Sequence, residues 1–131
     1  MNGGESRIVR RENFVLKIPQ YFNFLVEDFG YLMTEHQVSQ QDNGFILSDN
    51  FSYENLAVDR LITLRNAYHP VDYGFELCLY KPSVSKMNKD REMVYFRPKE
   101  QQDLDQTYLK EASRCLKDDF CQYITGERWF E

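Results

Sequence analysis

The chain has 131 residues and a mass of 15.7 kDa, with 42% hydrophobic residues, 28% charged residues and a net charge of -5. This length fits one domain. The large apolar residues exclude a disordered chain, and no apolar run is long enough for a membrane-spanning helix. The acidic balance argues against a dedicated nucleic-acid-binding protein.

Residues 1–13 are polar and glycine-bearing, and we expect them to be loosely ordered. The first predicted helix covers residues 19–29. Pro19 suits a first helical turn, where its missing N–H would be unpaired, and Gly30 suits the left-handed residue after a helix. The helical spacing comes from an apolar stripe made of Phe22, Leu25, Val26 and Phe29.

After residue 30 the apolar period changes to two, which is typical of strands. Asn43-Gly44 predicts a hairpin turn of type I′, in which both central residues have positive φ. Residues 45–53 resemble one strand interrupted at Asp49-Asn50. The other predicted strands cover residues 31–38, 60–66, 73–80 and 93–96, and the strand at 73–80 has one apolar face, made of Tyr73, Phe75, Leu77 and Leu79.

A long helix is predicted to begin at Asp103, with Gln106 in the capping-box position, and to end before Gly126. Its apolar stripe comprises Leu104, Tyr108, Ala112, Leu116 and Phe120. The element order predicts a single α+β domain over residues 1–131. In it, an antiparallel sheet of four to five strands is flanked by an N-terminal helix and a long C-terminal helix.

The sequence carries no motif for catalysis, metal binding or a phosphate cradle. His36 and Glu35 are adjacent in a predicted strand and therefore point to opposite faces. The three cysteines are odd in number and share no zinc-site spacing, and the N-terminus lacks the apolar stretch of a secretory signal. We therefore expect a cytoplasmic, non-enzymatic protein with no cofactor, no metal site and no catalytic residue.

Two other functions stay open at this point. A small enzyme or ligand-binding domain would place its site between sheet and helices, lined by His36, Cys78 or paired carboxylates. A nucleic-acid-associated domain would use the basic stretch at 81–99, in which cations surround two aromatic residues: Lys81, Lys86, Lys89, Arg91, Tyr95, Phe96, Arg97 and Lys99.

The charge is distributed unevenly along the chain. Residues 18–80 hold nine carboxylates against two arginines, a local charge of -7, whereas residues 81–100 have a local charge of +3. Tyrosines in the acidic segment add side chains that are frequent at protein interfaces, although strand positions that simply face water would give the same pattern. We predict binding of a basic protein through six residues: Tyr53, Glu54, Asp59, Asp72, Glu76 and Tyr80. Pairing of an exposed edge strand with a second copy is a further expectation.

Three short motifs resemble those of small bacterial α+β proteins, some of them immunity-protein-like and associated with polymorphic toxins. They are Phe29-Gly30-Tyr31 after an aromatic helix, Tyr53-Glu54-Asn55 in a strand, and the closing segment Ile124-Thr125-Gly126-Glu127. The resemblance spans most of residues 20–127. It implies a helix–sheet–helix fold and a non-enzymatic role, the binding and masking of another protein, and it assigns no functional residues.

Overall fold

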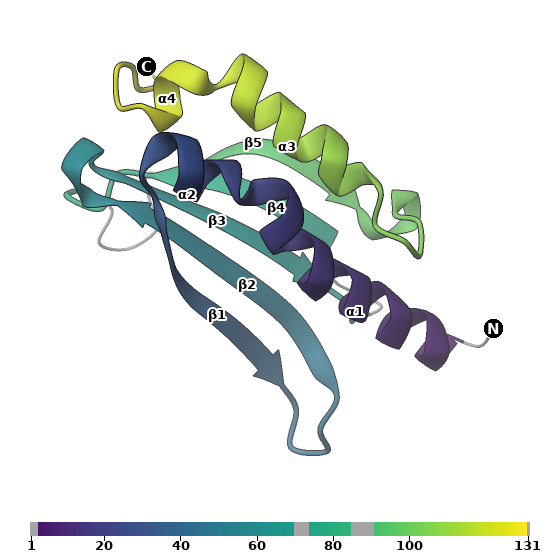
Figure 1. Ribbon diagram of the computed structural model, residues 1–131. Helices are drawn as coiled ribbons and strands as arrows, with labels where there is room; N and C mark the ends of the chain where they lie inside the picture. The colour runs from purple at the N-terminus through teal and green to yellow at the C-terminus, as the bar shows by residue number, and fades with distance from the viewer. Residues whose placement is uncertain (1–2, 70–73, 85–90, 131) are drawn as a thin grey trace.

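Four α-helices and five strands form the computed structural model, which describes residues 3–69, 74–84 and 91–130 (Figure 1). The helices are α1 (Gly3–Phe22), α2 (Phe24–Phe29), α3 (Tyr108–Asp119) and α4 (Cys121–Ile124). The strands are β1 (Leu32–Gln40), β2 (Ile46–Asn55), β3 (Arg60–Ala67), β4 (Gly74–Tyr80) and β5 (Glu92–Pro98). Short 3-10 turns follow β2 (η1, Leu56–Val58) and β5 (η2, Lys99–Gln101). The predicted α+β fold is confirmed.

The sheet is an antiparallel meander in the order β1-β2-β3-β4-β5. Helices α1 and α3 lie side by side across one of its faces (Figure 1). Beneath them, Phe51 of β2 is in register with Leu64 of β3, which is in register with Leu77 of β4. These three side chains belong to one buried cluster with Phe14, Ile18 and Leu116 from the helices, and this layer forms the core. No helix in the described part of the chain is long and apolar enough to cross a membrane.

Helix α1 begins sixteen residues earlier than the helix predicted at residue 19, so the expected loose segment is wrong for residues 3–13. Tertiary contacts explain the difference. Phe14 is fully buried, the Arg11 guanidinium pairs with Asp49, and the Asn13 amide donates to the Leu104 carbonyl at 2.9 Å. Pro19 therefore lies inside the helix, and its ring is exposed. The helical run breaks once, at Asn23, and Gly30 adopts the predicted left-handed conformation.

The hairpin between β1 and β2 is present, but its turn differs from the predicted type I′. Gly44 has a φ of 88°, whereas Asn43 does not have a positive φ. The Gln41 amide donates to the Phe45 carbonyl at 2.8 Å, so three residues rather than two close the loop. The predicted interruption at Asp49-Asn50 is also wrong, because β2 is continuous through both residues.

Helix α3 begins at Tyr108, five residues after the predicted start. Asp103 does accept a hydrogen bond from the Thr107 amide at 2.9 Å, as a capping residue would. Gln106, however, has a φ of 59°, and its side chain is drawn into the core by Asn66. The helical spacing is confirmed in the stripe that the core buries, made of Tyr108, Leu109, Ala112 and Leu116.

The C-terminal residues pack back onto the sheet around Arg60. Its Nε donates to the Tyr123 carbonyl and its Nη2 to the Arg128 carbonyl, both at 2.7 Å. The guanidinium carbon lies 4.7 Å from the centre of the Trp129 ring, and Phe130 stacks on Tyr123 at 4.3 Å. These contacts account for the aromatic residues that end the chain.

Candidate functional site

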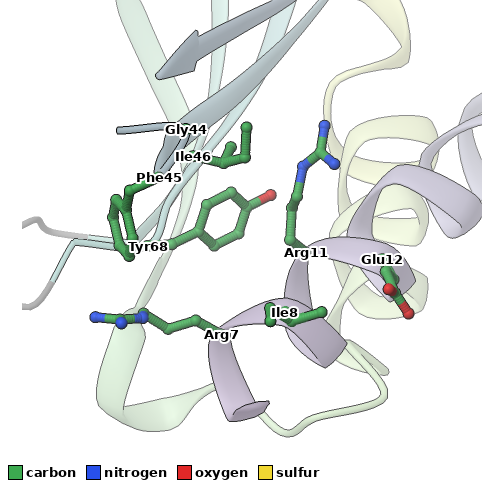
Figure 2. Close-up of a pocket in the computed structure, with 8 residues that line it drawn as sticks. All are labelled: Arg7, Ile8, Arg11, Glu12, Gly44, Phe45, Ile46 and Tyr68. Carbon is green, nitrogen blue, oxygen red and sulfur yellow. The ribbon is translucent and has the colours of Figure 1, made fainter. Parts of the chain in front are cut away.

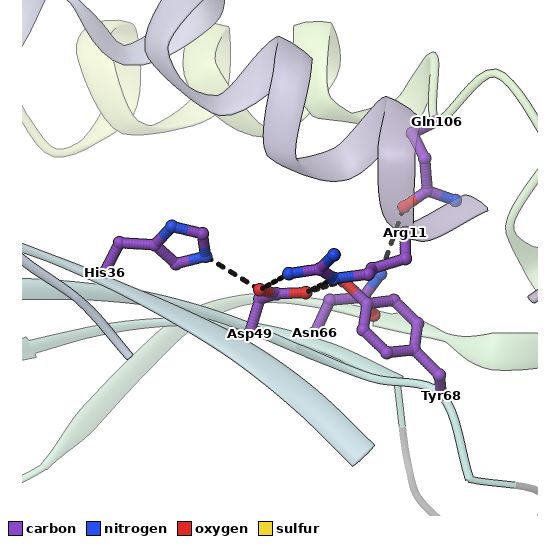
Figure 3. Close-up of polar contacts among 6 residues, drawn as sticks. All are labelled: Arg11, His36, Asp49, Asn66, Tyr68 and Gln106. Atoms are coloured by element: carbon purple, nitrogen blue, oxygen red, sulfur yellow. Dashed lines mark hydrogen bonds and ion pairs between the residues drawn. The ribbon is translucent and has the colours of Figure 1, made fainter. Parts of the chain in front are cut away.

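A buried carboxylate organises the polar contacts beneath α1. Asp49 has no exposed surface, and three side chains from other elements point at it (Figure 3). Arg11 donates through Nε to Oδ2 at 2.9 Å and through Nη2 to Oδ1 at 3.1 Å, and the Tyr68 hydroxyl lies 2.8 Å from Oδ2. His36 Nε2 lies 2.7 Å from Oδ1, and its ring stacks on Phe51 with centroids 4.1 Å apart. The carboxylate is therefore fully satisfied inside the protein.

The pKa values of both Arg11 and Tyr68, which contact Asp49, are raised. The hydrogen bond to Asp49 raises the pKa of Arg11. Burial, assisted by the negative charge of Asp49, raises the pKa of the Tyr68 hydroxyl well above its ordinary value. Both groups therefore keep their protons at neutral pH. The cluster links α1, β1 and β2 and stabilises their packing.

An amide network continues from this cluster toward α3. Asn66 Nδ2 donates to Gln106 Oε1 at 3.0 Å, and the Tyr108 hydroxyl donates to the same oxygen at 2.7 Å (Figure 3 shows the first contact). Gln102 Nε2 donates to Asn66 Oδ1, also at 3.0 Å. Asn66 and Gln106 are fully buried, so these contacts fix the entry to α3 and explain the left-handed backbone at Gln106.

A pocket of about 300 Å³ opens beside this cluster, between the N-terminal half of α1 and the start of β2. Its walls are largely apolar, and the Tyr68 ring lies in the middle with its hydroxyl toward Arg11 (Figure 2). The Arg7 guanidinium carbon lies 4.4 Å from the centre of the Phe45 ring. The lining residues are Arg7, Ile8, Arg11, Glu12, Gly44, Phe45, Ile46 and Tyr68.

The opposite face of the sheet carries a broad hollow of about 490 Å³, and no helix contributes to its lining. Its walls come from β1, β2, β3 and β4, together with Arg91 just before β5. We call this surface the open face. Its lining residues are Gln37, Ser39, Ser48, Asn50, Ser52, Leu61, Thr63, Arg65, Glu76, Cys78, Tyr80 and Arg91.

The structure separates the six residues predicted to bind a partner. Glu76 and Tyr80 line the open face, and Glu54 is in register with Leu61 beside it. Tyr53 is only 2% exposed and lies in the core beneath the helices, where burial raises its pKa to about 12. Asp59 lies in the turn before β3, where its carboxylate accepts hydrogen bonds from the Ser83 amide and hydroxyl, which lower its pKa. Asp72 lies outside the described residues.

The residues named for an enzymatic site do not come together. His36 points to the helix-covered side and contacts Asp49, whereas Cys78 lines the open face. Cys78 is 2% exposed, and burial raises the pKa of its thiol to about 11, which opposes formation of a nucleophilic thiolate. Within residues 3–69, 74–84 and 91–130, no group of three or more His, Cys, Asp or Glu side chains could hold a metal ion.

The described cations of the basic stretch have partners within the chain. Lys81 Nζ lies 5.4 Å from the centre of the Trp129 ring. Arg91 pairs with Glu76 at 3.2 Å, Arg97 pairs with Glu111 at 2.7 Å, and Lys99 donates to the His69 carbonyl. Tyr95 lies against α3 beside Glu111, whereas Phe96 is 43% exposed. Lys86 and Lys89 lie outside the described residues.

Sequence reasoning missed Arg11 and Asp49 as the polar centre of the molecule. A signal was available, because Leu47, Asp49, Phe51 and Tyr53 alternate along one strand. An acidic residue in phase with core aromatics requires a buried partner.

No family model matches the chain, and no similar curated protein or solved structure is found.

Proposed function

We propose that this chain is a non-enzymatic domain whose open face binds another protein. The observation that carries the proposal is the hollow of about 490 Å³ across β1 to β4, to which no helix contributes. A two-layer α+β domain needs only one sheet face for its core, and the second face is then available for a partner.

The chemistry of the open face supports recognition of a protein surface. Hydroxyl and amide groups of Ser52, Asn50 and Thr63 line it and can donate and accept hydrogen bonds. Tyr80 adds an amphipathic ring on β4, and beyond it on β5 Met93 and Phe96 are 45% and 43% exposed. Aromatic residues and methionine beside polar groups are the composition that protein interfaces favour.

The partner that we propose is a basic, toxin-like protein, as the resemblance to immunity-like proteins implies. Two carboxylates on the β1–β2 side of the face, Glu35 and Glu54, have no cationic partner among the described residues. Unpaired carboxylates on the sheet face that also carries an aromatic anchor, Tyr80, would accelerate the approach of a basic surface, while burial of the ring would slow its release.

The test compares two double charge reversals with the same change in net charge. Glu35→Lys/Glu54→Lys alters the open-face side, whereas the control Glu27→Lys/Asp28→Lys alters exposed residues at the end of α2. Both variants are immobilised and compared with the native chain for capture of the partner recovered from the source cells. We expect about tenfold weaker capture by the first variant, unchanged capture by the control, and equal melting temperatures.

Equal capture by both variants would remove the open face from consideration. Equal weakening in both would show that net charge alone, and no particular surface, governs binding.

The edge strand β1 supports a second proposal, in which two copies of the chain pair through it. All nine of its residues are exposed, and it contains no lysine, arginine or proline, the residues that commonly block edge pairing. Sedimentation of the native chain should show a dimer that Val38→Lys dissociates. A native chain that sediments as a monomer at all concentrations would contradict this second proposal.

A further inference from the structure

The pocket between α1 and β2 contains a cation without a carboxylate partner. Arg11, at one side of the pocket, is neutralised by Asp49 through two hydrogen bonds. Arg7 forms no ion pair among the described residues, and its Nε atom is shielded from solvent without a hydrogen-bond partner. Glu12 does not neutralise it, because its carboxylate points away from Arg7 and Phe45 (Figure 2).

The rest of the pocket is suited to an apolar body. Phe45, Ile46 and the ring of Tyr68 form one side, and Ile8, which is 59% exposed, lies across from them (Figure 2). The volume of about 300 Å³ lies at the lower end of the range for small-molecule sites. A cation beside aromatic walls selects a ligand with one negative charge and a planar or branched apolar part.

We propose that this pocket binds a small organic acid, with its carboxylate on Arg7 and its apolar body between Ile8, Phe45 and Tyr68. The carboxylate would accept hydrogen bonds from the terminal amino groups of the guanidinium, because the Nε–H is shielded from solvent and out of a ligand's reach. The single uncompensated charge favours a monoanion over a doubly charged phosphate. The inference goes beyond the proposed function, because the pocket lies on the helix-covered side of the sheet, opposite the open face.

The test is a titration of the native chain with each of four probes, in which binding is measured from the chemical shifts of backbone amides by NMR. Phenylacetate has the proposed chemistry, phenylacetamide lacks its charge, phenethylamine reverses the charge, and inorganic phosphate lacks the apolar body. We expect phenylacetate to cause saturable chemical-shift changes at Phe45, Ile46 and Tyr68. The other three probes should bind with an affinity at least roughly tenfold lower. No saturable shift with phenylacetate, or equal binding of the amine or of phosphate, would overturn the proposal.

Two arginine variants show whether the effect is local. Arg7→Gln removes the proposed contact, and Arg10→Gln removes the same charge from the next turn, where Arg10 contacts the Ser6 carbonyl and does not line the pocket. Phenylacetate affinity should fall roughly tenfold in the first variant and stay unchanged in the second. Equal losses in both would assign the binding to the general charge of α1 and overturn the site. The four-probe comparison on the native chain decides the matter even if a variant fails to fold.

Discussion

At the scale of single residues, Asp49 is the buried carboxylate that joins α1, β1 and the residue after β3. It is fully buried and contacts Arg11, His36 and Tyr68, which come from three different segments. A buried ion pair adds little stability compared with an apolar replacement of both partners, but the removal of one partner leaves the other without compensation.

Asp49→Ala should therefore lower the free energy of unfolding by about 3 kcal/mol, because Arg11 and Tyr68 lose their acceptor. Urea denaturation followed by circular dichroism measures the change. Asp42→Ala is the matched control, since Asp42 is exposed in the hairpin loop and should change stability by less than about 0.5 kcal/mol. Equal unfolding midpoints for the two variants would show that the cluster does not stabilise the fold.

The three cysteines differ enough to give an ordered chemical reaction. Cys78 is buried, Cys115 is half-buried and Cys121 is exposed. Burial raises the pKa of the Cys78 thiol from 9.0 to about 11, so at pH 8 a smaller fraction of it is thiolate than in the unfolded chain.

Iodoacetamide at pH 8 should therefore modify Cys121 first and Cys78 last, and peptide mass spectrometry at successive times gives the order. The pKa of Cys78 is higher in the folded than in the unfolded protein. Its contribution to the free energy of unfolding is therefore fully present below about pH 9 and is lost as the pH rises toward 11. Modification of Cys78 before Cys121 in the folded protein would contradict this description of the sheet.

At the scale of the elements, some parts of the fold could be predicted from sequence patterns, whereas the start of α1 could not. Alternation and helical spacing predicted β3, β4 and the α3 stripe, since those signals are local. The first turns of α1 gave no such signal, because their order depends on Asp49 and on the loop before α3, both distant in sequence. The late start of α3 has the same cause, because Gln106 contacts Asn66 forty residues away.

The packing of α1 makes a direct prediction for Phe14, which lies before the helix that the sequence predicted at residues 19–29. Phe14→Ala should destabilise the protein by about 3–5 kcal/mol, because Phe14 is fully buried and contacts the rings of Phe51 and Phe75 edge-on. Leu16→Ala, two residues away and 58% exposed, should cost less than about 1 kcal/mol. Thermal unfolding of both variants measures the difference, and equal melting temperatures would contradict the placement of α1 over the sheet.

At the scale of the whole molecule, the sheet divides two surfaces with different chemistry. The helix-covered side holds the core, the Asp49 cluster and the small pocket at Arg7. The open face holds hydroxyl, amide and aromatic groups and has no covering helix in the described part of the chain. Of the predicted binding residues, Glu76 and Tyr80 could be placed there from strand alternation, whereas the same alternation puts Tyr53 in the core.

The central claim, that a partner protein occupies the open face, is tested most directly by hydroxyl-radical footprinting of the free and partner-bound protein. Met93 and Phe96 report on the open face, because they are in register with Cys78 and Glu76, which line it. Leu16, with 58% of its surface exposed on α1, is the reference side chain. We predict at least about threefold slower oxidation of Met93 and Phe96 in the complex, with no change at Leu16. Protection of Leu16 with full reactivity at Met93 and Phe96 would place the partner on the helices and contradict the proposed function.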